Sequence, residues 1–329
     1  MEFFRKDIIE WLLEPSNPSV RFWALQQLQD KPLTHPEVQA AQKAINKSAI
    51  VKAILGAQSP EGHWGNPDNN YLKKYTATTH SLLILAELGA ERSPAIEKGI
   101  NHMFEFQVNS GHFLTNRPKT KRGLASKVSD MCCFDGNILY YLVYFGYLED
   151  ARVKRLIDFL VNHHDNKAGG WLCRAYPINP EGVFPTNCYM GMYRIFRAFS
   201  IIPDRHRSPI INRIIGKAVE VMLENGIYKY LRAPDGQRKE KAGWKRFGFP
   251  LFYNADVLEV LDTLTRLNIH DNRMQDSIDL VVSNRRPDGK WLLQHSFNDS
   301  MWHDIEVKGQ PSKWITLRAL RVLRRYYGK

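Results

Sequence analysis

Apolar residues recur at spacings of three and four along most of this chain, which is the period of an α-helix. The pattern is clearest in TTHSLLILAELGA (78–90), GNILYYLVYFGYL (136–148), NADVLEVLDTLTRLN (254–268) and SKWITLRALRVLRRYY (312–327). Strand-like alternation with hairpin turn signals is nearly absent. The periodicity therefore predicts an all-α protein.

The predicted helices come in pairs of two kinds. The stretch 136–148 is apolar all round, whereas the next stretch, DARVKRLIDFLVNHH (150–164), carries its charges on one face. A helix that is apolar all round must be covered on every side, while an amphipathic helix can face water. Alternation of the two kinds predicts concentric layers, with inner helices wrapped by outer ones.

A short turn signature separates outer from inner helices. Its clearest copy is QSPEGHWG (58–65), and weaker copies lie at 107–113, 165–171 and 285–291. In each copy a glycine precedes an aromatic residue by one or two positions. Glycine permits the positive φ of a tight turn, and the aromatic ring anchors that turn on neighbouring helices.

The Q-x-x-x-G-x-W pattern of residues 58–64 resembles the QW motif of squalene and oxidosqualene cyclases. The alternating helices resemble the α/α toroid (α-α barrel) that these cyclases share with protein prenyltransferases. The resemblance implies a toroid of about five or six helical hairpins over residues 46–329, preceded by an N-terminal helical extension over 1–45. Because NPSVRFWALQQL (17–28) also resembles a HEAT-type helix, an α-solenoid remains an alternative.

The resemblance further implies a terpenoid-cyclase/prenyltransferase-like protein that binds an apolar or isoprenoid-type ligand in a central cavity. The inner helices of a toroid run parallel, so their N-termini place several partial positive charges at one mouth of the cavity. That mouth would suit an anionic head group. The candidate ligand-binding residues near inner-helix starts are Lys74, Tyr75, Arg246, Tyr253, Lys313 and Trp314.

A cyclase also requires a catalytic acid. The chain has neither the D-x-D-D run of triterpene cyclases nor a D-D-x-x-D run, so the candidates are the isolated aspartates Asp135 and Asp256 at predicted inner-helix starts. Each is either a buried acid with a raised pKa or a first-turn residue favoured by the helix dipole. His303, in the loop HSFNDSMWHD (295–304), is either a general acid/base in a lid or a surface residue.

The four cysteines suggest a zinc site as one of three interpretations. Cys133 and Cys188 lie at inner-helix starts, and Cys173 lies between them in the chain, so three thiolates from neighbouring hairpins could meet. The candidates for a fourth ligand are Cys132, Asp130, His163 and His164. Asp130 and Cys132 match the Asp-x-Cys zinc ligands of protein prenyltransferases, although the later histidine of those enzymes has no counterpart here. Buried structural thiols are the second interpretation, and a disulfide, which a reducing compartment disfavours, is the third.

The net charge of +12 admits a different class of function. Basic surfaces attract nucleic acid, so a non-enzymatic helical scaffold that binds nucleic acid or protein is the competing hypothesis. The first residues form an amphipathic pattern with acidic positions and no cleavage site, and no apolar stretch is long enough to span a bilayer. We therefore expect a cytoplasmic protein without stable membrane insertion. The sequence makes no prediction of oligomeric state.

Overall fold

The computed structural model of the protein describes residues 3–118, 120, 131–171, 188–231 and 238–328. Within these ranges the chain is mostly helical, and the strands form two short antiparallel pairs. One pair joins β1 (Lys229–Leu231) to β2 (Arg238–Glu240), and the other joins β3 (Trp291–Leu292) to β4 (Pro311–Ser312). The prediction of an all-α fold is confirmed.

In the described part of the chain, six helices form an inner ring. Each packs against the next, in the order α2, α5, α8, α10, α12, α14 and back to α2. Between α2 and α5 the ring is closed by Trp23, whose indole N–H donates to the Glu87 carbonyl at 3.1 Å. The inner helices are α2 (Pro18–Gln27), α5 (Thr78–Leu88), α8 (Cys132–Tyr144), α10 (Tyr189–Ser200), α12 (Val257–Arg266) and α14 (Lys313–Tyr327).

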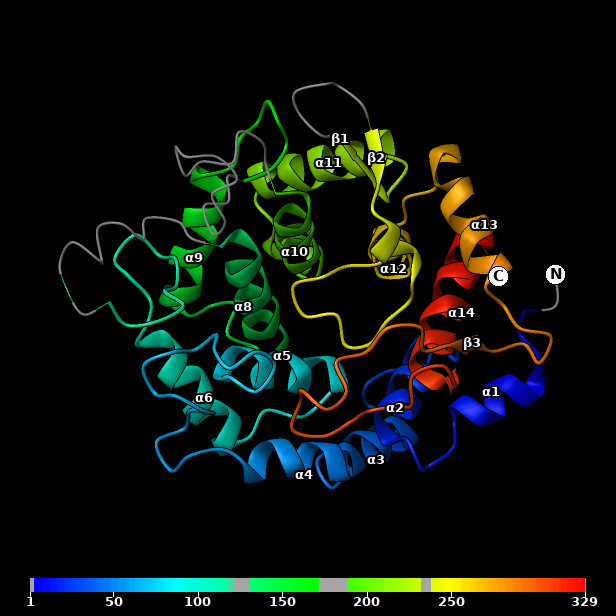
Figure 1. Ribbon diagram of the computed structural model, residues 1–329, viewed down its shortest axis with the longest axis horizontal. Helices are drawn as coiled ribbons and strands as arrows, with labels where there is room; N and C mark the ends of the chain where they lie inside the picture. The colour runs from blue at the N-terminus through cyan, green and yellow to red at the C-terminus, as the bar shows by residue number, and fades with distance from the viewer. Residues whose placement is uncertain (1–2, 119, 121–130, 172–187, 232–237, 329) are drawn as a thin grey trace.

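The remaining α-helices surround this ring (Figure 1). In the described structure α3 packs on α2, α6 on α5, α9 on α8, α11 on α10, α13 on α12, and α1 against both α2 and α14. The outer helices are α1 (Lys6–Leu12), α3 (Pro36–Ile45), α4 (Ala49–Gly56), α6 (Pro94–Phe104), α9 (Ala151–Asn162), α11 (Pro209–Glu224) and α13 (Gln275–Ser283). Three 3₁₀ turns are described at η1 (Asp204–His206), η2 (Ala242–Lys245) and η3 (Asn272–Met274).

This arrangement is the predicted α/α toroid. The inner helix α2 lies within the first 45 residues and contacts α14, so this part of the chain also contributes to the ring. The division into 1–45 and 46–329 stays a prediction about folding units. Among the described helices, none combines the length and the apolar character that crossing a bilayer would require.

The glycine–aromatic turns join neighbouring layers by hydrogen bonds. The indole N–H of Trp64 donates to Ile54 O at the end of the preceding outer helix, at 2.6 Å, and Trp171 and Trp291 make the corresponding bonds to Leu160 O and Val281 O at 2.7 Å. Each turn therefore fixes the end of one outer helix before the chain enters the ring.

The backbone of two of these turns also contacts the following inner helix. The backbone N–H of Trp64 donates to Thr78 Oγ1 at 3.1 Å, and that of Trp291 donates to Thr316 Oγ1 at 3.0 Å. The turn around Gly111 packs so closely on the next outer helix that a Cβ there would lie 2.2 Å from Arg155 O, and its φ is +107°. Only glycine fits this position without a shift of the backbone.

Inner helices α8 and α10 approach each other through two glycines. A Cβ added to Gly136 would lie 2.7 Å from the carbonyl carbon of Arg194, and one added to Gly191 would lie 2.0 Å from Cys132 Sγ. The absence of side chains lets the two backbones pack in near contact. The close packing also fixes the position of α10, which carries Arg194, relative to α8.

Candidate ligand-binding site

A cavity of about 270 Å³ lies inside the ring, lined mainly by the C-terminal halves of the inner helices and also by Glu259 and Trp314 near the starts of α12 and α14. All six inner helices contribute to its wall, together with the loop residue Phe249. Arginines and carboxylates form one part of the wall, and aromatic side chains form another. The lining residues are Trp23, Gln27, Glu87, Tyr140, Val143, Tyr144, Arg197, Ile201, Phe249, Glu259, Asp262, Thr263, Arg266, Trp314, Arg318, Arg321 and Arg325. We call this cavity the arginine pocket.

Helical spacing brings the charged residues of the wall together. Arg318, Arg321 and Arg325 follow one another at intervals of three and four along α14, so they share one face of the helix. On α12, Glu259 and Asp262 stand at the same kind of interval. These two faces meet because α12 packs against α14 in the ring.

Glu259 is the most deeply buried carboxylate of this wall. Arg194 donates to its two oxygens at 3.1 and 2.8 Å, and Arg197 Nε lies 3.5 Å from Oε1. Burial alone would raise the pKa of Glu259, but Arg194, Arg197 and Arg318 outweigh burial and lower that pKa. Glu259 is therefore ionised and held by two arginines of α10.

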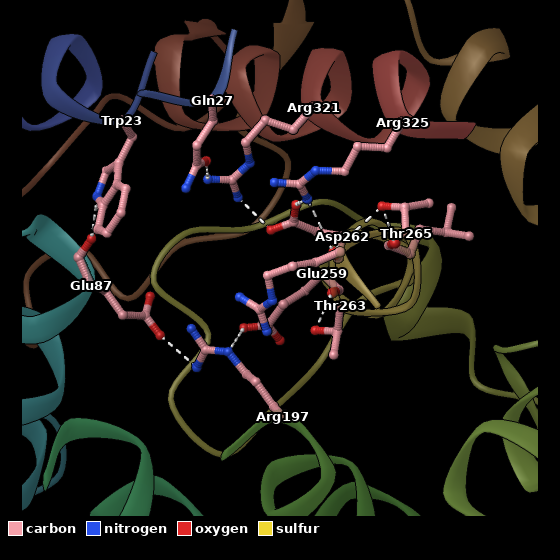
Figure 2. Close-up of polar contacts among 12 residues, drawn as sticks. Trp23, Gln27, Glu87, Arg197, Glu259, Asp262, Thr263, Thr265, Arg321 and Arg325 are labelled. Carbon is pink, nitrogen blue, oxygen red and sulfur yellow. Dashed lines mark hydrogen bonds and ion pairs between the residues drawn. The ribbon is translucent and has the colours of Figure 1, made fainter. Parts of the chain in front are cut away.

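Glu87 and Asp262 complete the set of paired carboxylates. Arg197 Nη1 lies 2.9 Å from Glu87 Oε1, and Asp262 lies between Arg321 and Arg325, with 2.9 Å to Arg325 Nη1 (Figure 2). Burial would raise the pKa of Asp262, but Arg321 and Arg325 outweigh it and lower that pKa to about 2. Each carboxylate of the wall thus already has a guanidinium partner.

Arg318 differs from the other arginines of the pocket. Its side chain is buried, at 6% exposure, and makes no hydrogen bond or ion pair with any described residue. Burial would lower its pKa, but Glu259, Asp256, Asp262 and Glu87 act from a distance and raise the pKa, so the guanidinium stays charged. A buried guanidinium without a contacting acceptor is costly unless something else satisfies it.

The positive charge of the arginines in the wall could serve two purposes, helix stabilisation and anion binding. The C-terminal ends of the inner helices carry partial negative charge, so arginines at this end stabilise the helices. However, the wall holds more arginines than carboxylates, and the carboxylates are paired. The excess, centred on Arg318, leaves donors for an anion in the cavity.

Aromatic side chains provide the apolar part of the same wall. Phe249 and Trp314 stack with ring centroids 4.0 Å apart and planes 12° from parallel, and the Arg197 guanidinium lies 3.9 Å from the centre of the Tyr140 ring. The indole N–H of Trp314 is buried and has no acceptor among the described residues. The pocket therefore combines cationic donors with flat apolar surfaces, which suits an organic anion with an apolar part.

The sequence-predicted site lies at the opposite, N-terminal mouth of the ring. There the structure brings together Lys74, Tyr75 and Tyr253: the two phenol oxygens are 3.4 Å apart, and Lys74 Nζ lies 4.8 Å from the Tyr253 ring centre. The ring of Tyr75 also packs on Phe252 and Phe297, with centroids 4.7 and 4.1 Å away. These rings fill the mouth.

Among the described residues, the cavity at that mouth is small. The cavity beside His80, Cys133 and Asn137 has a volume of about 10 Å³, which is about what one water molecule needs. Burial, with help from Lys74, lowers the pKa of His80 to about 3, so this histidine is neutral at physiological pH. Of these two cavities in the described part of the chain, the arginine pocket is the larger.

The two candidate acids have structural partners. Asp135 Oδ1 accepts the backbone N–H of Phe113 at 2.9 Å, which joins the turn at 107–113 to α8. Asp256 caps α12: Oδ1 accepts from Glu259 N at 2.7 Å and Oδ2 from Gly248 N at 2.8 Å. Burial raises the pKa of Asp256 to about 7 against the pull of Arg318, so the raised pKa expected for a buried acid is present at a capping position.

The other predicted ligand residues lie apart from one another. Lys313 contacts the outer helix α1 region, with Nζ 2.6 Å from Glu14 Oε2, and Arg246 is exposed at the end of η2. His303 is exposed, and its Nδ1 lies 2.5 Å from the backbone oxygen of Asp304. Trp314 alone among the predicted residues lines the arginine pocket.

Two of the three predicted zinc ligands are described, and Cys173 lies outside the described residues, as does Asp130. Cys188 caps α10, where its Sγ accepts from Gly191 N at 3.4 Å, while Cys133 lines the small cavity beside His80. Among the described residues, no three His, Cys, Asp or Glu side chains gather closely enough to hold a metal ion. A zinc site would thus need a ligand from outside the described residues, where Cys173 and Asp130 lie.

Comparison with known proteins adds structural neighbours. No protein-family model matches the chain, and no curated protein matches it. An apo variant of the type II terpene cyclase MstE from Scytonema is 14% identical with a TM-score of 0.45, over 98% of this chain and 99% of that one. A protein from Actinoplanes is 12% identical with a TM-score of 0.45, over 96% of this chain and 90% of its own.

A further MstE variant was solved in complex with its substrate, geranylgeranyl dihydroxybenzoate. It is 14% identical to this chain, with a TM-score of 0.44 over 99% of both chains. Since identity and TM-score are low in every case, we base the fold on the ring of helices and the site on its own geometry. By that geometry the chain is an all-α toroid with a central, cationic pocket.

Proposed function

We propose that this protein binds a small organic anion with an apolar part, of the isoprenoid diphosphate type, in the arginine pocket. The observation that carries the proposal is Arg318, a buried charged side chain without a hydrogen-bond or ion-pair partner among the described residues, in the wall of a 270 Å³ cavity, where its guanidinium lies 5.7 Å from the centre of the Phe249 ring. Phosphate and diphosphate oxygens accept charge-assisted hydrogen bonds from guanidinium groups. The resemblance of the helical repeats to terpenoid cyclases and prenyltransferases favours the isoprenoid class.

Titration calorimetry with farnesyl diphosphate, farnesol and inorganic diphosphate tests the proposal. Farnesyl diphosphate should bind more tightly than farnesol, because only the diphosphate can accept from Arg318 and its neighbours. Arg318→Met removes the charge and keeps an unbranched side chain of similar bulk. It should weaken farnesyl diphosphate binding at least about tenfold, since a hydrogen bond to a charged group contributes about 1.5–3 kcal/mol.

The matched control is Arg286→Met. Arg286 lies on the surface, where it pairs with Asp288, and does not line the pocket. It should bind farnesyl diphosphate as the unaltered protein does. Equal binding of farnesol and farnesyl diphosphate, unchanged in Arg318→Met, would contradict the proposal. Salt-sensitive binding to DNA that farnesyl diphosphate does not displace would instead favour the helical scaffold that uses its basic surface.

We also propose, separately, that the protein binds zinc. A further proposal is that it is cytoplasmic. Thiolates of Cys133, Cys173 and Cys188 would hold the ion, and a bound zinc ion would act as a Lewis acid. Metal analysis of the purified protein, and of variants with each of these cysteines changed to serine, tests it. Stoichiometric zinc that is lost in every variant supports the site, whereas stable, metal-free protein contradicts it.

A further inference from the structure

A second cavity lies next to the arginine pocket and opens to the surface. Its volume is about 390 Å³, and apolar side chains from α2, α8 and the following loops make up much of its wall. Phe22, Ala90 and Phe145 are buried in it, while Leu33 at its rim is 59% exposed. We call this cavity the lateral groove.

Among the described residues, two side chains are shared by the walls of the two cavities, Trp23 and Tyr144. Their ring centroids are 6.4 Å apart, with planes at 56°. The indole N–H of Trp23 donates to Glu87 O at 3.1 Å, and the hydroxyl of Tyr144 donates to Ala90 O at 3.2 Å. One layer of aromatic side chains therefore separates the arginine pocket from the lateral groove. Each of the two side chains makes one hydrogen bond, between neutral groups, in the described structure.

The charges of the two cavities are different in kind. The arginine pocket has unsatisfied donors around Arg318, whereas the two charged side chains of the groove have partners: Glu91 accepts from Asn46 at 3.2 Å, and Arg92 Nε lies 2.7 Å from Glu97 Oε1. The groove thus offers mainly apolar contact. A head group with negative charge fits the first cavity, and a hydrocarbon chain fits the second.

We propose that the apolar chain of the ligand passes between Trp23 and Tyr144 and lies in the lateral groove, while its anionic head is held in the arginine pocket. This inference rests on the proposed function and extends it to a class: single-chain amphipathic anions whose chain is long enough to leave the pocket. Exposed Leu33 is then covered by the chain of the bound ligand, and Trp23 is the side chain that the chain displaces or contacts.

A series of n-alkyl phosphates separates the two parts of the ligand. Inorganic phosphate, butyl phosphate and octyl phosphate, each below the concentration at which micelles form, are titrated into the full-length protein by calorimetry. Each methylene that enters an apolar site adds up to about fourfold in affinity. Octyl phosphate should therefore bind at least about tenfold more tightly than butyl phosphate, and Trp23 fluorescence should change only with the longer chain.

Leu33→Glu places a carboxylate at the rim of the groove. It should bring the affinity for octyl phosphate down toward that for butyl phosphate, and leave binding of inorganic phosphate as it was. The matched control is Val307→Glu, which makes the same change at another exposed apolar side chain, 66% exposed and outside both cavities. It should keep the full gain with chain length.

The outcomes distinguish the two proposals. If phosphates bind and Arg318→Met weakens them, but chain length or Leu33→Glu makes no difference, the groove is not the chain site and the proposed function stands. If octyl phosphate binds equally well in Arg318→Met and inorganic phosphate does not bind at all, the anion pocket fails, and the inference fails with it. Loss of the chain-length gain in Val307→Glu as well would also overturn the inference.

Discussion

Glu259 on α12 and Arg194 on α10 form a two-bond ion pair in the interior of the ring, with side chains 3% and 0% exposed. The pair joins two inner helices, and Arg197 on α10 extends it to Glu87 on α5. Three inner helices are thus joined by a buried network of charges. Glu87, Arg197 and Glu259 of this network also line the arginine pocket.

Glu259→Gln tests how much this network depends on its central carboxylate. The change leaves Arg194 buried without a charged partner, removes one of the two carboxylates that pair with Arg197, and removes the carboxylate that acts most strongly on Arg318. Breaking a buried pair on one side costs about 3–5 kcal/mol of unfolding free energy. Urea unfolding followed by circular dichroism measures the loss.

The control for this variant is Glu10→Gln on α1. Glu10 pairs with Lys6 at 3.7 Å, and both side chains are mostly exposed, so its loss should cost at most about 1 kcal/mol. If Glu259→Gln and Glu10→Gln proved equally mild, the buried network would have no structural importance and the arginines would face water instead.

The close approach of α8 and α10 predicts a steric effect at Gly136. A Cβ at this position would lie 2.7 Å from the backbone of Arg194 and Ile195, so Gly136→Ala must push the helices apart. Overpacking of this kind costs about 1–3 kcal/mol, even though alanine is the better helix former. Thermal unfolding should show a lower midpoint for this variant.

Gly216→Ala in α11 is the matched control, because nothing lies within 4 Å of the Cβ that it adds. At that open helical position alanine should stabilise the protein by about 0.5–1 kcal/mol. Opposite signs for the two glycine-to-alanine changes would support the close packing. A gain in stability at Gly136 would show that the two inner helices are farther apart than described.

The fold could be predicted from the sequence because its signals are local. The three-and-four spacing of apolar residues and the glycine–aromatic turns such as Gly62–Trp64 depend only on near neighbours in the chain. The structure gives these turns their role, since Trp64 and Trp291 fix outer-helix ends through their indole N–H groups. Local patterns of this kind carry the information for a toroid.

The pocket could not be predicted in the same way, because its pairs join distant parts of the chain. Arg194 and Glu259 are 65 residues apart, and the basic run at 318–325 alone is typical of a solvated helix face. One signal was present in the sequence. Glu259 interrupts an apolar stretch of a helix expected to be covered on most sides, and a covered charge requires a partner from another element.

The N-terminal mouth was expected to be the binding end because helix N-termini attract anions. In the described part of the chain aromatic rings pack at that mouth, with Tyr75 against Phe252 and Phe297, and the arginine pocket is larger than the cavity described beside them. A ligand site at the N-terminal mouth stays a prediction. The dipole rule describes the backbone alone. At the C-terminal ends of the helices, the positive guanidinium groups of side chains such as Arg318 and Arg321 outweigh the partial negative charge of the backbone.

Asp256 and His80 should give the stability of the protein two opposite dependences on pH. The pKa of Asp256 is about 7, above its ordinary 3.8, so between about pH 4 and 7 the native state holds a proton that the unfolded chain has lost. This group therefore makes the protein less stable as pH rises through that window. The pKa of His80 is about 3, below its ordinary 6.5, so in nearly the same window the unfolded chain holds the extra proton, and stability rises with pH.

Each effect becomes visible when the other group is removed. Urea unfolding of Asp256→Asn at pH 4, 5, 6 and 7 should show a stability that rises with pH more steeply than that of the unaltered protein, by up to about 4 kcal/mol over the window. His80→Gln should show the reverse, a stability that falls relative to the unaltered protein as pH rises. Asparagine still accepts from Glu259 N but cannot accept from Gly248 N as well. Asp256→Asn should therefore also be less stable than the unaltered protein at acidic pH. Parallel curves for Asp256→Asn and the unaltered protein would mean that Asp256 is ionised at pH 5 and that its carboxylate is reached by water.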